Sequence, residues 1–318
     1  MTGVQTCALP ILDFVTGDIL DILQSRRKEF TESYFLSIPK EERDGVKCLI
    51  SDMYNPYIKY TSSYFLHAQP IVDSFHVLQW LNTLINRYIN NVKKKYQERD
   101  RKILEQRNYS HNKDFQSQKE SKEVYILNHA RWVILQNRKH WTYHERRYNH
   151  RLDMYMDSFE WEKSFLSLDD HFSDIRTLKD LYDEFNESYI NDLENATRRL
   201  DELIGIYSAS SLDIFRQFAN LLKTYHDPIV ASFTYLKTET DENHDEICRR
   251  LSNGPMEAFN GKPSGLRSQS HGISNFDFFR NRILWSIRDD APILAVPKTE
   301  RQIHFFTGKK RGSYNTEK

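Results

Sequence analysis

The sequence has few of the residues that cross-link or anchor a protein. It contains three cysteines in 318 residues, at positions 7, 48 and 248. They are too few and too far apart for a disulfide framework or a CxxC zinc pair. No apolar run approaches the roughly 18–20 residues that a membrane-spanning helix requires. These absences exclude disulfide-rich secreted scaffolds and membrane proteins, and they are typical of a soluble cytoplasmic protein.

The sequence also has no excess of charge of either sign. Lys and Arg total 45, as do Asp and Glu, so the formal net charge is zero. A protein that binds nucleic acid usually shows a basic excess. The charge is uneven, however, because residues 87–107 hold eight Lys or Arg against three Asp or Glu, whereas residues 153–202 are acidic. A basic face can therefore exist within a neutral whole.

The first eleven residues read MTGVQTCALPI. They lack the basic start and the apolar core of a signal peptide. They resemble the translation of a common sequencing-library adapter, so we expect residues 1–11 to be an assembly artefact and the gene to begin upstream. Resequencing the locus from native DNA tests this expectation. Finding the stretch in the organism's own gene would contradict it.

What is present in residues 12–76 alternates short strands and helices. The apolar periodicity and the turn residues predict strands at 12–15, 18–23, 46–51 and 70–72, and helices at 28–38 and 54–66. This order resembles a ribonuclease H-like core that has lost its first strand. The predicted fold class is α/β, an incomplete ribonuclease H-like core with a large all-α insertion.

The remaining sequence is mostly helical in pattern. Apolar residues at helical spacing, beginning with Val77, Leu78 and Leu81, predict a helical insertion over residues 77–245. Residues 246–295 are expected to form C-terminal core helices. Residues 296–318 are polar and basic and are expected to form a flexible tail.

Three acidic residues stand where ligands of a hard metal ion are often found. Asp52 and Asp73 each end a short apolar run, and open α/β sheets bind ligands at the carboxyl ends of their strands. Taken alone, an Asp at such a place is more often part of a turn. Glu257 follows Ser252, Asn253 and Pro255, a pattern that predicts a helix start with Glu257 in its first turn.

Residues 251–284 read LSNGPMEAFNGKPSGLRSQSHGISNFDFFRNRIL. The stretch resembles the C-terminal signature of the ISL3-type DDE transposases of bacterial insertion sequences, which it matches at Asn253, Gly254, Glu257, Asn260, Lys262, Gly272, Asn275, Phe276, Phe279, Arg280, Arg282, Ile283 and Leu284. The upstream stretches ISDMYNPYI, HAQPIVDSFHV and LNHARWVIL resemble three further segments of that family in the same order. The resemblance covers most of the chain after Leu12.

The resemblance implies a catalytic domain with three metal-binding acids. Asp52 matches the second acid and Glu257 the third, which makes both candidate catalytic residues and metal ligands. The first acid is expected on a strand upstream of Leu12, and Asp13 is interpreted as non-catalytic. Supporting roles are expected of Asp73, which is also the alternative second acid, and of His76, Asn260 and Arg280.

The implied reaction is in-line displacement at phosphorus, assisted by Mg²⁺ or Mn²⁺. The expected partner is double-stranded DNA, both transposon ends and target, in the cytoplasm of a bacterium and associated with its nucleoid. No membrane partner is expected, and homo-oligomer formation is left open. The candidate DNA-binding residues are Lys93, Lys94, Lys95, Arg99, Lys262 and Arg267, although a solvated helix face explains those of residues 93–99 equally well.

The chain departs from the family pattern after Glu257. Pro263 interrupts the expected basic run and is predicted to kink or shorten the helix. Because the first acid is also missing, we expect no strand transfer from the 318-residue chain. A plasmid-cleavage assay with the purified chain and Mg²⁺ checks this expectation, and metal-dependent cleavage would contradict it.

Two other functions fit the same residues. A ribonuclease H-like nuclease that cuts without joining would also use Asp52 and Glu257. A non-catalytic, helical DNA-binding remnant would use the basic stretch around Lys94. Terminal inverted repeats around the reading frame would favour transposition over a host nuclease.

Overall fold

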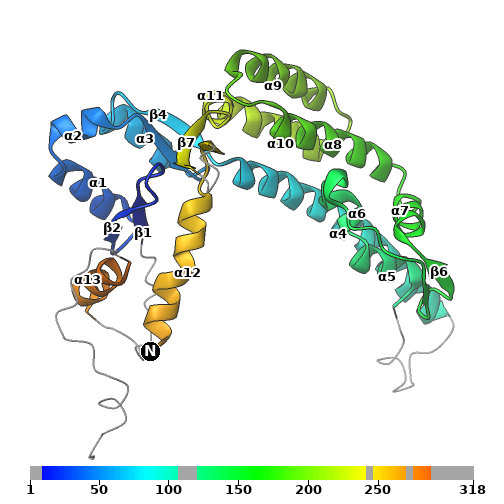
Figure 1. The fold of residues 1–318 in the computed structure, drawn as a ribbon. Helices are drawn as coiled ribbons and strands as arrows, with labels where there is room; N and C mark the ends of the chain where they lie inside the picture. The colour runs from blue at the N-terminus through cyan, green and yellow to red at the C-terminus, as the bar shows by residue number, and fades with distance from the viewer. Residues whose placement is uncertain (1–8, 107–119, 241–245, 270–274, 288–318) are drawn as a thin grey trace, which may run out of the picture. The chain divides into compact units, whose positions relative to one another are not determined.

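A computed structural model describes residues 9–106, 120–240, 246–269 and 275–287 (Figure 1). The chain divides into two compact units, residues 1–260 and 261–318. The first unit holds every described strand and helices α1 to α11. The fold is mixed α/β and mainly helical, and its sheets have two strands each.

The chain begins with an antiparallel hairpin of β1 (Leu9–Leu12) and β2 (Ile19–Leu23). The prediction of a strand at residues 12–15 was wrong, because the Asp13 carboxylate accepts the backbone N–H groups of Val15 and Thr16 and closes a turn there. Gly17 completes the turn with a φ of +76°. Residues 9–11 are part of β1, and the adapter origin of residues 1–11 stays a prediction.

A parallel strand pair follows. β3 (Cys48–Ser51) and β4 (Gln69–Val72) pair in register, with Ser51 opposite Val72. Helices α1 (Lys28–Ser37) and α2 (Lys40–Gly45) precede the pair, and α3 (Asn55–Ser63) connects its strands. All but α2 were predicted, to within three residues at each end. The parallel pairing brings residues 52 and 73 out at the same edge.

The helical insertion has its own core. α4 (Ser74–Gln106) is a 33-residue helix whose predicted apolar face is buried at Val77, Leu81 and Leu84. The other helices in the described part of the insertion are α5 (Lys122–His129), α6 (Trp132–Leu135), α7 (Ser158–Leu166), α8 (Phe172–Ser188), α9 (Leu193–Ser208), α10 (Asp213–Thr224) and α11 (His226–Ala231). Aromatic side chains from these helices, including Tyr182, Tyr207 and Phe215, are fully buried.

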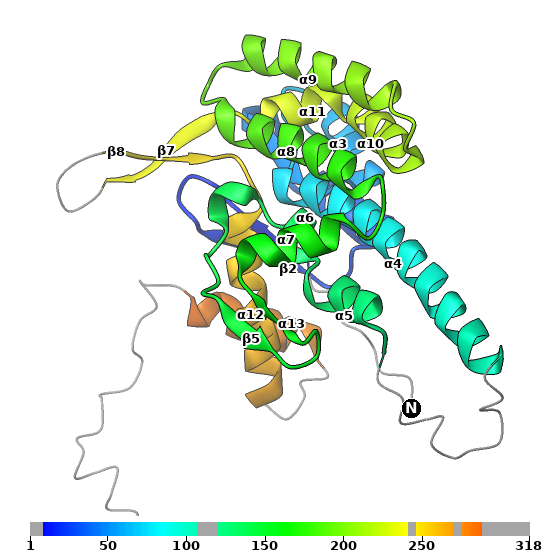
Figure 2. The ribbon, with the colours of Figure 1, turned by 90° about the vertical axis from the view of Figure 1, so that its right-hand side faces the viewer.

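Two hairpins interrupt the helical pattern and were not predicted. β5 (Arg147–Asn149) pairs with β6 (Met154–Met156) between α6 and α7. β7 (Tyr235–Thr240) pairs with β8 (Glu246–Arg250), and Figure 2 shows these two strands side by side. The expectation that residues 246–250 begin the C-terminal helices was wrong, because they pair with β7. The residues of these strands show little of the alternation of apolar and polar side chains that indicates a strand.

The last helices among the described residues are α12 (Gly254–Gln269) and α13 (Phe276–Ser286). α12 starts as predicted, but it is not shortened at Pro263 and continues to Gln269. A proline inside a helix removes one backbone hydrogen bond, and the remaining bonds can still carry the helix onward. Asn275 caps α13 by accepting the N–H of Phe278. The expected tail at residues 296–318 lies outside the described residues.

Within the described ranges, none of the helices is both long enough and apolar enough to cross a membrane. Cys48 and Cys248 are free thiols, and burial raises the pKa of Cys48, with a smaller contribution from Asp13. A raised pKa disfavours the reactive thiolate, and Cys48 packs against the small buried cluster of Ile71, Ala231 and Leu251.

Candidate metal site

Asp73 lies where strand β4 passes into helix α4. Its side chain is nearly buried, with the residue 2 % exposed. The backbone N–H of Asp73 donates to Ser51 O at 3.0 Å, which extends the parallel pairing by one residue. Its carbonyl oxygen accepts the N–H of His76, and its carboxylate accepts the N–H of Phe75 at 3.4 Å. The strand and the helix start therefore hold this carboxylate in a fixed place.

His76 stands on the first turn of α4, three residues after Asp73. This spacing puts the two side chains on one face of the helix. The His76 Nε2 atom lies 3.9 Å from Asp73 Oδ2, and its Nδ1 atom lies 3.2 Å from Gln79 Oε1. A contact to each ring nitrogen fixes the orientation of the imidazole, as is usual for a metal-binding histidine.

Glu257 reaches the same place from the far end of the first unit's sequence. It lies in the first turn of α12, where its N–H donates to Asn253 O at 2.9 Å. Glu257 Oε1 lies 3.6 Å from His76 Nε2, and the Glu257 side chain is 47 % exposed.

Strand β8 determines where α12 begins. Leu251, next after β8, is buried, and its N–H donates to Thr234 O at 3.0 Å. The guanidinium of Arg250 donates to the backbone oxygens of Ser232 and Asn186 and packs over the ring of Phe233 at 4.0 Å. Burial lowers the pKa of Arg250. This anchor was not predicted, and no sequence motif indicates it, because its partners Ser232 and Asn186 lie 18 and 64 residues away in the sequence.

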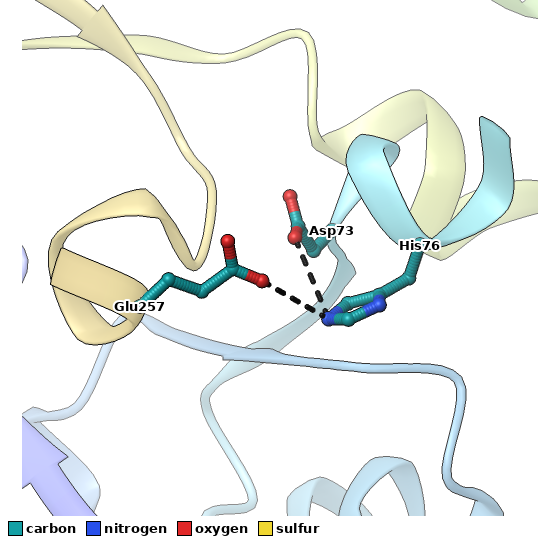
Figure 3. Close-up of side chains that lie close together, drawn as sticks. All are labelled: Asp73, His76 and Glu257. Carbon is teal, nitrogen blue, oxygen red and sulfur yellow. Dashed lines mark ion pairs between the residues drawn. The ribbon is translucent and has the colours of Figure 1, made fainter. Parts of the chain in front are cut away.

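Together the three side chains form a group that could hold a metal ion. Ligand atoms of Asp73, His76 and Glu257 all lie within 4.8 Å of one another (Figure 3). The figure shows the Glu257 carboxylate and the Asp73 carboxylate directed at the same nitrogen of His76. Two carboxylates and an imidazole are ordinary ligands of divalent cations.

Asp52 lies beside this group rather than within it. It follows β3, and its Oδ1 atom accepts the N–H of Tyr54 at 3.1 Å. Asp52 lines a pocket of about 300 Å³ together with His76, and the other lining residues are Met53, Tyr54, Gln79, Trp80 and Thr83. The structure thus brings Glu257 to Asp73, the alternative second acid, with Asp52 in the adjoining pocket. The role of Asp52 as a metal ligand stays a prediction.

The other predicted supporting residues are placed only in part. Asn260 is exposed on α12, one turn after Glu257. Arg280 lies on α13 in the second unit and donates to Asn281 Oδ1 at 3.2 Å. The side chains of Lys262 and Arg267 lie outside the described residues.

The predicted DNA-binding residues of α4 differ in their surroundings. Lys94 and Lys95 are exposed. Lys93 donates to Asn128 on α5, and Arg99 donates to Glu123 and Asp100. The hydrogen bonds to Glu123 and then to Asp100 raise the pKa of Arg99. Arg99 is therefore engaged within the protein, which leaves Lys94 and Lys95 as the candidates best placed for phosphate.

Comparison with known proteins identifies a family for most of the chain. Neither the curated proteins nor the solved structures gave a match. A family profile described as transposase, that of the ISL3-type DDE transposases, matches residues 3–283, which is most of the sequence. The resemblance seen in the motifs is confirmed, and the chain belongs to the ISL3-type DDE transposase family.

Proposed function

We propose that this chain carries the metal site of a transposase that cleaves and joins DNA strands during movement of an insertion sequence. The observation that carries the proposal is the convergence of Asp73, His76 and Glu257, in which Glu257 comes from about 180 positions away in the sequence. A structural ion pair needs no such convergence of three potential ligands at a helix start. Membership of the transposase family supplies the reaction class.

The donor set suits a divalent cation such as Mg²⁺ or Mn²⁺. Carboxylate oxygens are the ligands that both ions prefer, and an added imidazole is accepted more readily by Mn²⁺. Such an ion, when bound, supplies a Lewis acid that activates a water or a DNA 3′-hydroxyl and stabilises the leaving oxygen at phosphorus. The chain's part is to hold the ligands. Asp73 is fixed by β4, and His76 is oriented by Gln79.

Asp52 is proposed as a further acid of the same site. Ser51 and Val72 are paired across the parallel strands, so residues 52 and 73 follow at neighbouring positions. Neighbouring strands lie about 4.8 Å apart, which is within reach of two carboxylates that share metal ions. Asp52 also lines the pocket that His76 lines, and this pocket is a place for the reacting phosphate.

The arrangement of elements supports an incomplete ribonuclease H-like core with a helical insertion. A hairpin is followed by a parallel pair, then by the helices α4 to α11, and finally by the helix that carries Glu257. The insertion thus separates the strand-borne acids from the helix-borne acid. Catalytic residues at the carboxyl ends of parallel strands agree with the general behaviour of open α/β sheets.

Manganese titration of the purified chain tests the metal site. We expect one or more Mn²⁺ ions to bind, as measured by paramagnetic resonance of the free ion, and Glu257→Gln to weaken binding roughly 10- to 100-fold. The matched control is Glu29→Gln, which alters an exposed glutamate in the first turn of another helix, α1. Equal affinity in wild type and Glu257→Gln would contradict the proposed ligand set.

A strand-transfer assay on the protein translated from the native locus tests the reaction. We expect Asp52→Ala and Glu257→Ala each to abolish joining of transposon ends to a target plasmid while DNA binding is retained. Retained cleavage with no joining in the wild-type protein would instead favour the nuclease alternative. Unchanged DNA binding with no response to metal would favour a non-catalytic remnant.

A further inference from the structure

The β5–β6 hairpin carries a cluster of aromatic and basic side chains that the proposed reaction does not use. Tyr148 and Tyr155 face each other as a cross-strand pair and are 42 % and 55 % exposed. Arg146 and His150 flank them, and the side chain of Arg147 is 83 % exposed. Large exposed rings gain little for the fold, because their apolar area stays in water. A surface of this kind indicates a partner.

The rings are held in one arrangement. The Tyr148 ring lies 5.2 Å from that of Tyr155 and 4.9 Å from that of His150, both edge-to-face. The Arg146 guanidinium lies 5.5 Å over the Tyr155 ring, and the Tyr148 hydroxyl donates to Asp153. These contacts restrict the motion of rings that remain largely exposed, so that little conformational entropy is lost on binding.

The hairpin is anchored to the helical insertion beneath it. Leu152 and Met156 are buried, and Lys122 at the start of α5 donates to Leu152 O at 2.6 Å. The side chain of Asn149 accepts the N–H groups of Arg151 and Leu152 and so fixes the turn. The exposed rings therefore stand on a rigid support rather than on a loose loop.

The charge of the hairpin favours an anionic partner. Arg146, Arg147 and Arg151 stand against two acids, Glu145 and Asp153. Asp153 is engaged with Tyr148, and Glu145 lies 3.8 Å from Arg147 in a highly exposed pair of small energetic weight. Arginine next to open tyrosine faces is the combination that binds phosphates and bases of a single strand.

We propose that this face, formed by Arg146, Tyr148, His150 and Tyr155, binds DNA whose bases are unpaired. The tyrosine rings stack on bases, and Arg146 contacts an adjacent phosphate. Unpaired bases are required because a duplex hides the base faces on which a ring would stack. The inference rests on the proposed function only in taking DNA as the substrate, and it names a second place where that DNA is held.

The location of the hairpin indicates which part of the DNA it meets. α5 packs along α4, where Glu123 pairs with Arg99, and the neighbouring Lys122 holds the hairpin. Figure 1 shows β6 beside α5 and α7. From His76 to Arg99 helix α4 rises roughly 35 Å, at 1.5 Å per residue. That length corresponds to about ten base pairs of duplex, at 3.4 Å each, so we expect the hairpin to meet DNA about ten base pairs away from the metal site.

Fluorescence anisotropy tests the inference with the full chain and labelled DNA in EDTA, so that the metal site plays no part. The probes are a 20-nucleotide oligo(dT) and a 20-base-pair duplex. We expect Tyr148→Ala with Tyr155→Ala to weaken binding of the single strand at least tenfold and of the duplex less than twofold. Tyr148→Phe with Tyr155→Phe should bind as wild type does, because the rings remain.

Matched variants separate stacking from charge. Arg146→Ala should weaken binding to both probes and reduce the dependence of log affinity on log salt by about 0.7 for the single strand. The control Arg26→Ala, also at an exposed arginine, should change neither. The proposal would be overturned if the Tyr148→Ala, Tyr155→Ala variant bound the single strand as wild type does, or lost equal affinity for the single strand and the duplex. Weak binding of the single strand by the Tyr148→Phe, Tyr155→Phe variant would also overturn it. Because the readout is metal-free, these results are independent of the Mn²⁺ titration.

Discussion

Replacing Arg250 by alanine is expected to lower the free energy of unfolding by roughly 3 kcal/mol and to weaken Mn²⁺ binding about tenfold. Arg250 donates two hydrogen bonds to Asn186 and two to Ser232. Its removal leaves buried oxygens without donors. It also releases the end of β8 from which α12 starts, so the Glu257 carboxylate loses its fixed position. Urea unfolding and Mn²⁺ titration below the unfolding transition measure the two effects.

The neighbouring residue provides the control. Arg249 lies on the same strand and is exposed, so Arg249→Ala should change both quantities little. A purely structural role of Arg250 would lower stability and leave the affinity of the folded protein for Mn²⁺ unchanged. That outcome would contradict its assignment as a positioning residue for Glu257.

Replacing Asp183 by alanine is expected to cost more, roughly 3–5 kcal/mol of unfolding free energy. Lys179 on α8 is fully buried, and its ammonium donates to the Asp183 carboxylate one turn later. Burial raises the pKa of Asp183, and Lys179 opposes that shift. Without the carboxylate, the Lys179 charge stays in the core of the insertion with no counter-ion. Urea unfolding followed by circular dichroism measures the loss.

The pair itself is expected to add little net stability. Taking two charges out of water costs about as much as their attraction returns. Lys179→Met with Asp183→Leu should therefore regain most of the stability lost in Asp183→Ala. A loss below about 1 kcal/mol in Asp183→Ala would contradict the dependence of the buried Lys179 side chain on this carboxylate.

Apart from α2, the strands and helices before residue 77 could be predicted from the sequence because their signals are local. Alternating apolar residues, Pro39 and the Asp residues after β3 and β4 mark where elements begin and end. The first strand was predicted too far along the sequence, because Asp13 was counted as a strand residue. An aspartate whose carboxylate can accept nearby backbone N–H groups competes with strand pairing, and here it formed the turn.

The hairpins were missed because their pairing depends on tertiary contacts. β5 and β6 have three residues each, too few to show a period, and they are held by Lys122 and Asn149. β8 was assigned to a helix because its residues contain no turn signal. Short strands of this kind are selected by packing rather than by propensity.

The candidate site was predictable in its composition and less so in its geometry. Motifs identified Asp52, Asp73, His76 and Glu257. Which of the two aspartates stands nearest Glu257 could not be derived, because the choice depends on the start of α12. That start is set by Arg250 and by contacts distant in sequence. The arrangement of Asp73 and His76 was open to prediction, since three-residue spacing at a helix start puts both on one face.

The helical insertion determines the local concentration of the Glu257 carboxylate at Asp73 and His76. A flexible chain of about 180 residues would pay roughly 4–5 kcal/mol of closure entropy to bring its ends together. Asp73 and His76 need no such closure, because one helical turn joins them. Folding of the insertion already includes this entropy cost. The insertion therefore acts as a rigid spacer that keeps the Glu257 carboxylate close to Asp73 and His76. A metal ion should accordingly bind only the folded chain and raise its melting temperature with ion concentration.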